Sequence, residues 1–87
     1  MHEFSLLEDL LNKIKQIASE NNSKQVVGVK IRIGALAHIS AAHFREHFEH
    51  ASSGTVAEGA ELEITTSEDQ EDPNAQDILL ESVELSE

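Results

Sequence analysis

The spacing of the hydrophobic residues changes along this chain, and this change is the strongest constraint on its fold. In the first segment they recur at steps of three and four, which places them on one face of a helix. The residues on this face are Phe4, Leu7, Leu11, Ile14 and Ala18, widened by Leu6, Leu10 and Ile17. From Val26 to Gly34 the step falls to two, as in a strand with one buried face. A helix and a strand must therefore share one core.

The ends of the first helix carry recognisable signals. Ser5 with Glu8 three residues later matches a capping box, so we expect the helix to begin at Ser5 or a residue or two earlier. If it begins at Ser5, Met1 to Glu3 form a short flexible segment ahead of it. Asn21-Asn22 is expected to end the helix.

A second helix and two further strands follow. Ser40 is the expected cap of this helix, and Gly54 is expected to stop it. Its inward stripe is expected to be Phe44, Phe48 and Ala51. In the strand from Val26, the expected buried side is Val27, Val29, Ile31 and Ile33, opposite Lys30 and Arg32. Leu62 and Ile64 alternate with Glu61 and Glu63 in a short strand, and 78–85 is expected to form the last strand, in which Glu81 and Ser82 weaken the alternation.

This order of elements predicts an α+β fold, with two helices packed on one face of a small, about three-stranded sheet. At 87 residues we expect a single domain over 1–87, in which 65–77 is a polar, acidic connector. The chain has no cysteine, which excludes disulfides and thiolate zinc or iron–sulfur sites within it. The hydrophobic core alone must hold such a fold together.

The charge of the chain narrows its partners. Its 17 acidic and 6 basic side chains give a net charge of −11, which repels nucleic-acid phosphates and anionic membrane surfaces. We therefore expect neither nucleic acid nor a membrane as a partner. The sequence has no signal-peptide pattern and no apolar run long enough to span a bilayer, so the expected location is the cytoplasm.

The first three residues, Met1, His2 and Glu3, are the leading candidates for a metal site. They offer the terminal amine, an imidazole, backbone nitrogens and a carboxylate within one short segment. Nitrogen and oxygen ligands in a flat arrangement suit Ni(II) or Cu(II). Binding should weaken on acidification, because protons compete for the same nitrogens.

Three further histidines, His43, His47 and His50, recur at four- and three-residue steps. On a helix they project within an arc of roughly 60 degrees, next to the expected apolar stripe. One interpretation is an exposed polar face, and the other is adventitious binding of zinc, copper or nickel. The run from His43 to His47 also matches the inverted zinc-peptidase pattern, although a chain this short leaves little room for a further ligand and a cleft. His38 is expected to be a loop residue.

Nothing in the sequence indicates catalysis. The serines stand in cap, turn and loop contexts, and none lies in a nucleophile-elbow pattern. The glycines are scattered singly, so no phosphate-binding loop is present. We therefore expect a protein that is not an enzyme.

Several segments together resemble one family in order and spacing. They are Met1-His2-Glu3-Phe4-Ser5-Leu6, Val29-Lys30-Ile31-Arg32-Ile33-Gly34-Ala35-Leu36, the stretch from Gly54 to Ile64, and the stretch from Ile78 to Leu85. The family is that of the HypA/HybF hydrogenase maturation factors, which are nickel metallochaperones. Members carry a zinc domain with two Cys-x-x-Cys pairs between the last two strands, whereas here 65–77 fills that gap without a cysteine. Natural loss and excision both fit this gap.

The resemblance implies that the N-terminal segment holds Ni(II) for delivery to the large subunit of a nickel–iron hydrogenase, together with a maturation GTPase. His2 would supply its imidazole and backbone nitrogen, and Glu3 and the amine of Met1 would complete the site. Two alternatives stay open. In the first, the chain is an interaction module that has the same fold but does not transfer metal. In the second, it is a generic metal buffer that uses His43, His47 and His50.

Overall fold

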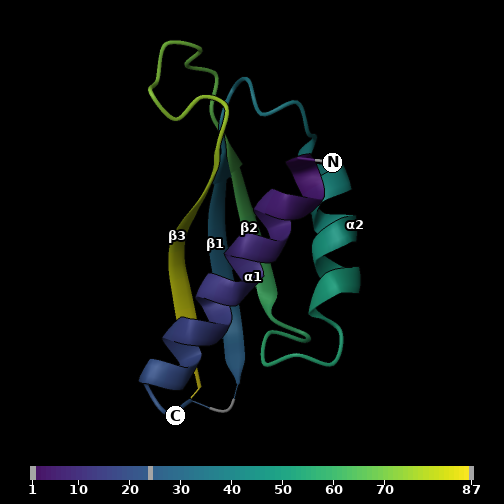
Figure 1. Cartoon of the computed structure of the whole chain (residues 1–87), viewed down its shortest axis with the longest axis vertical. Coiled ribbons are helices and arrows are strands. Elements are labelled where there is room, and N and C mark those ends of the chain that lie inside the picture. Colours follow the sequence, from purple (N-terminus) through teal and green to yellow (C-terminus); the bar gives the residue numbers. More distant parts are fainter. Residues whose placement is uncertain (1, 24, 87) are drawn as a thin grey trace.

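The described part of the chain contains two helices and three strands in its computed structural model. Their order is α1 (His2–Glu20), β1 (Val26–Ile33), α2 (Ala41–Ser52), β2 (Glu61–Thr66) and β3 (Ile78–Leu85) (Figure 1). The structure describes residues 2–23 and 25–86, and within these ranges the side chains from residue 7 onward. The expected order of elements and the α+β class are confirmed.

The three strands form one mixed sheet with β1 in the centre, in the order β2-β1-β3. β1 and β2 are parallel, with Val29 opposite Leu62, whereas β1 and β3 are antiparallel, with Ile33 opposite Ile78. Parallel strands require a crossover between them, and α2 lies in that connection. Because β1 and β2 end at the same edge, the chain after β2 passes the end of β1 before it returns as β3 (Figure 1).

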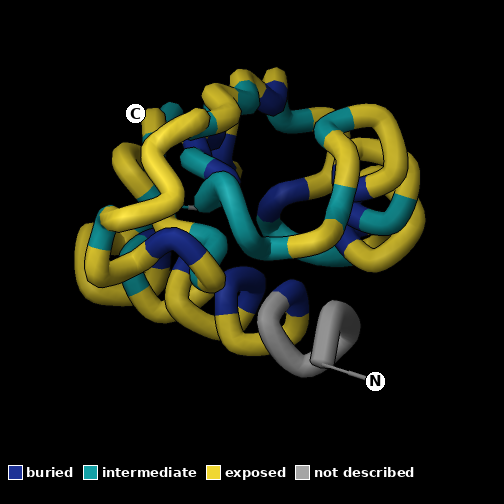
Figure 2. Tube along the Cα trace, turned by 90° about the horizontal axis from the view of Figure 1, so that it is seen from above, coloured by how far each residue is buried: buried dark blue, intermediate teal, exposed yellow. Residues whose placement is uncertain are grey.

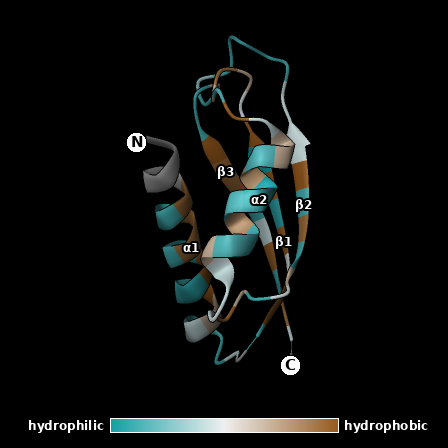
Figure 3. Cartoon of the chain, turned by 90° about the vertical axis from the view of Figure 1, so that its right-hand side faces the viewer, coloured by the Kyte–Doolittle hydropathy of each residue, from teal (hydrophilic) through white to brown (hydrophobic). Residues whose placement is uncertain are grey.

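Both helices cover the same face of this sheet, as expected (Figure 3). Their buried positions lie on the inner side (Figure 2). The apolar stripe of α1 packs toward β3, and α2 packs toward β2. The largest fully buried side chains are Phe44, Phe48, Ile14, Ile31 and Val26. On α2 the third inward residue is Ser52, which is buried, whereas the expected Ala51 is exposed, because steps of four continue from Phe44 and Phe48. No helix in the described residues has the length and apolar character needed to cross a bilayer.

The expected buried side of β1 is wrong at Val27, which is 38% exposed, while Val26 is fully buried. The pairing with β3 moves from Val26–Leu85 to Gly28–Glu84, so Val27 is an extra residue on β1. Such a bulge shifts the alternation of faces by one residue.

A second irregularity, between Lys30 and Ile31, makes Glu81 the extra residue on β3. On β3 the half-buried positions are Ile78, Leu80, Val83 and Leu85, so their spacing changes from two to three at Glu81. This is the physical reason for the weak alternation in that segment.

The connector between β2 and β3 covers the end of β1. β2 continues to Thr66, so the first two residues of the range 65–77 belong to this strand and the connector follows from residue 67. The amide of Gly34 donates to the carbonyl of Asp77 at 2.9 Å, and the amide of Leu36 donates to the carbonyl of Ala75 at 2.7 Å. Ala75 is 4% exposed, so one residue of this otherwise polar segment lies in the interior.

Candidate metal-binding residues

The first candidate site lies at the start of α1. The helix begins at His2, three residues before the cap expected at Ser5, so Ser5 lies inside the helix. No glycine or proline interrupts the chain there, and Glu3 in the first turn suits the positive end of the helix dipole. The backbone of His2 and Glu3 is therefore helical and does not form the flexible segment expected ahead of the helix. Met1 and the side chains of His2 and Glu3 lie outside the described residues.

The helical start affects which nitrogens a metal can use. The first four amide groups of an α-helix have no carbonyl partner within the helix. The amides of His2 and Glu3 belong to this set, so helix formation leaves them available. The positive end of the helix dipole disfavours a bare cation, so negatively charged ligands must offset it.

The second group of candidates lies on α2, where the structure brings two of the three histidines together. The Nε2 atoms of His43 and His47 are 2.7 Å apart, and their ring centroids are 4.5 Å apart with a tilt of 36°. At this distance one ring nitrogen donates and the other accepts, and the tautomer of each ring decides which of the two is the donor. His43 is exposed and His47 is half-buried.

Neighbouring residues fix the orientation of α2. Phe44 and Phe48 are 1% and 2% exposed and stack with centroids 6.3 Å apart. The hydroxyl of Ser40 accepts a hydrogen bond from the amide of His43 at 3.1 Å, which confirms the expected cap. Gly54, with φ of +79°, follows the helix as expected. The two histidines each precede a buried phenylalanine, which places them beside the buried stripe of α2.

The remaining histidines do not join this pair into a larger group. Across the described residues, no set of three or more histidine, cysteine, aspartate or glutamate side chains is arranged to hold a metal ion. His50 is exposed near the end of α2, one turn beyond His47. His38 is exposed in the loop between β1 and α2, as expected, with φ of 59°. Among the described residues, the His43–His47 pair is therefore the closest approach to a metal site.

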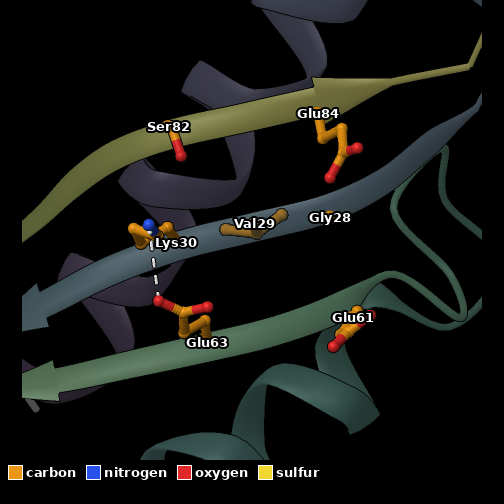
Figure 4. A pocket seen from close by; sticks show the side chains of 7 residues that line it. All are labelled: Gly28, Val29, Lys30, Glu61, Glu63, Ser82 and Glu84. Carbon is orange, nitrogen blue, oxygen red and sulfur yellow. Dashed lines mark ion pairs between the residues drawn. The ribbon is translucent and has the colours of Figure 1, made fainter.

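The outer face of the sheet is the other polar feature, and sequence reasoning did not identify it. Figure 4 shows Lys30, Glu61, Glu63, Ser82 and Glu84 on this face, with both helices behind the strands. The ammonium of Lys30 lies 3.4 Å from the carboxylate of Glu63, and both side chains are largely exposed. The alternation of β1 and β2 placed these charges outward, but only the parallel register shows that they meet. An exposed pair of this kind contributes little to stability and indicates no chemistry.

The family model described as "Hydrogenase/urease nickel incorporation, metallochaperone, hypA" matches residues 1–71, which is most of the chain. The chain belongs to the HypA family. Maturation factors named HypA are 40% identical over 65 residues in Archaeoglobus fulgidus and 44% identical over 62 residues in Aquifex aeolicus. A HybF factor of Salmonella typhimurium is 39% identical over 64 residues. The resemblance found in the sequence is therefore confirmed.

These matches cover a larger share of this chain than of its relatives. They cover 71% to 75% of this HypA-family chain but 54% to 59% of those three relatives. The chain thus spans somewhat more than half the length of the curated relatives. Its fold is similar to the solution structure of the nickel metallochaperone HypA from Helicobacter pylori, with a TM-score of 0.76 and 17% identity. That match covers 95% of this chain and 96% of the other, and it shows the α+β fold of the family.

Proposed function

We propose that this chain is a nickel-binding metallochaperone for the maturation of nickel–iron hydrogenase, and that Met1, His2 and Glu3 hold the Ni(II). The observation that carries this proposal is the family match, which begins at residue 1 and so includes all three residues. Its description names nickel incorporation into hydrogenase and urease. Nickel is then the cargo of an accessory protein, which binds it and passes it on.

The donor atoms of the segment suit this cargo. The imidazole of His2, the amine of Met1 and the adjoining amide nitrogens supply nitrogen ligands, and Glu3 supplies carboxylate oxygen. Nitrogen ligands in a plane favour square-planar Ni(II), whereas added water and carboxylate oxygens favour six-coordination. A ligand set at the chain end has open positions, so another protein can take the ion by replacing one ligand at a time.

The partners follow from the same proposal. The large subunit of a nickel–iron hydrogenase would receive the ion, and a maturation GTPase would assist its transfer. The chain contains no cysteine, so thiolate-bound zinc is no part of this function in the sequence at hand. The N-terminal nickel site proposed here uses only residues at the start of the chain, so nickel binding at that site should persist without a zinc site.

Calorimetric titration of Ni(II) tests the site. We expect His2→Ala, and a chain with one extra residue before Met1, each to lose the N-terminal equivalent of nickel. The matched control is His38→Ala, which removes an exposed loop imidazole and should leave the stoichiometry unchanged. The parent should also bind more weakly at about pH 5 than at about pH 7.5, because imidazole is protonated near 6.5. Unchanged stoichiometry in both N-terminal variants would contradict the proposal.

The second candidate function is an interaction module that keeps the fold without transferring metal. The observation in its favour is that the chain spans only 54% to 59% of three curated relatives. The same titration separates the two functions, because an interaction module gives no N-terminal equivalent of nickel in the parent protein.

A further inference from the structure

Helix α2 places two imidazoles side by side, where one ion can reach both. His43 and His47 are one helical turn apart, and each is followed by a phenylalanine that is at least 98% buried. The packing of Phe44 and Phe48 fixes the rotation of the helix, so the two histidines lie beside its buried stripe, with His43 exposed and His47 half-buried. Ser40 caps the amide of His43 itself and holds the first turn in place.

The separation of the two nitrogens indicates which metal geometry fits. When two imidazole nitrogens lie about 2.05 Å from one metal ion, they are about 2.9 Å apart at an angle of 90° and about 3.4 Å apart at the tetrahedral angle. The observed 2.7 Å between the Nε2 atoms is closer to the first value. Adjacent positions of a square-planar or octahedral ion therefore require smaller side-chain shifts than the tetrahedral geometry of zinc.

The charges around the pair favour a cation. Glu46 and Glu49 lie on the same helix, and the whole chain carries a net charge of −11. Arg45 is the only arginine or lysine in α2, and its guanidinium donates to the carbonyl of Leu62 on β2 at 2.9 Å. The positive side chain of this helix is thus directed to the sheet.

We propose that His43 and His47 form a second metal site, a two-nitrogen chelate for Cu(II) or Ni(II), in addition to the site proposed at the N-terminal segment. Both rings bind through Nε2, and water fills the other positions. The ring that now donates through Nε2 binds as its other tautomer, with its proton on Nδ1. Two protein ligands make this site weaker than the three- or four-ligand sites of zinc proteins.

Titration of Cu(II), followed by calorimetry and electron paramagnetic resonance, tests this site. We expect His43→Ala and His47→Ala each to weaken one equivalent of bound Cu(II) by roughly tenfold or more, since a removed ligand costs at least as much as a removed supporting group. The matched control is His50→Ala, which lies on the same helix and should retain that equivalent. In the parent, the spectrum of this equivalent should show two coordinated nitrogens.

Further variants distinguish loss of the His43–His47 site from loss of the proposed N-terminal site and from unfolding. His2→Ala should keep the His43–His47 equivalent, so loss of one site leaves the other measurable. Thermal unfolding should show that Cu(II) raises the Tm of the parent and of His50→Ala more than that of His43→Ala or His43→Gln. If His43→Ala or His43→Gln, folded by circular dichroism, binds the same number of ions with an affinity within about twofold, the proposal is overturned. Equal losses in His50→Ala and His43→Ala overturn it as well.

Discussion

Gly34 is the residue at which the end of β1 touches the connector. A Cβ atom at this position would lie 2.2 Å from the carbonyl oxygen of Ala75, and backbone atoms cannot move aside as a flexible side chain can. We expect Gly34→Ala to lower the free energy of unfolding by about 3 kcal/mol, the upper part of the usual range for overpacking. Urea-induced unfolding measures this loss.

Gly54 provides the matched control for this prediction. It has φ of +79°, and a Cβ there would meet nothing within 4 Å, so Gly54→Ala adds backbone strain without a clash. Its expected cost is about 1 kcal/mol. Equal costs for the two variants would show that the connector does not press on Gly34 in solution.

Two of the residues that sequence reasoning misplaced share one physical cause. Val27 and Ala75 took positions set by pairing between distant segments, which no local pattern records. The alternation in β1 fails at Val27 because a bulge against β3 inserts one residue there. Ala75 sits in a run of polar residues, and only its contact with the end of β1 buries it. Gly34 at the end of β1 was the one available signal of this contact. In the sequence it indicated only the end of a strand.

Among the elements, α2 is the one whose cap can be tested directly. The hydroxyl of Ser40 accepts from the amide of His43, which otherwise has no carbonyl partner in the helix. We expect Ser40→Ala to lower the free energy of unfolding by about 1 kcal/mol and to speed hydrogen exchange at the amide of His43. Denaturant unfolding and amide exchange measure the two effects.

Ser40→Asp separates the cap from the serine itself, because a carboxylate at this position also accepts from the first turn. Its stability should stay within a few tenths of a kcal/mol of the parent. A loss as large as that of Ser40→Ala would assign the effect to some other contact of Ser40.

At this scale the elements themselves were predictable, because each depends on a local pattern. The periods of α1 and β1, the cap at Ser40 and the glycine after α2 all lie within short windows of sequence. The start of α1 at His2 was not predicted, since a capping-box match at Ser5 competes poorly with an uninterrupted helical stretch before it. Of the candidate site, the spacing predicted that His43 and His47 share a helix face. The 2.7 Å between their rings depends on side-chain rotamers that spacing does not encode.

Over the whole molecule, charge is distributed more unevenly than hydrophobicity. From residue 67 to the end of the chain the sequence has many carboxylates and no lysine or arginine. In the described residues the only ion pair between side chains is Lys30–Glu63, with both side chains exposed. Such a pair contributes between zero and about 1 kcal/mol. Repulsion among the acidic groups therefore outweighs attraction in the folded chain.

This imbalance predicts how stability depends on salt. Raising sodium chloride from about 0.01 M to about 0.15 M shortens the screening length from about 30 Å to about 8 Å. Two like charges about 10 Å apart repel by about 0.4 kcal/mol in water, so relief of several such repulsions stabilises the fold by about 1 kcal/mol. For a domain of this size, that corresponds to a rise in Tm of about 4 to 8 °C. Thermal unfolding monitored by circular dichroism measures it.

Variants in the connector identify the source of this salt response. Glu68→Gln with Glu71→Gln lowers the net charge from −11 to −9 and should reduce the rise in Tm. Gln70→Glu is the opposite change, because it adds a charge between Asp69 and Glu71 and should enlarge the rise. One variant removes negative charge and the other adds it, so their effects on the salt-induced rise in Tm must have opposite signs. A Tm that falls as salt is added would instead mean that attractive pairs such as Lys30–Glu63 dominate the folded state.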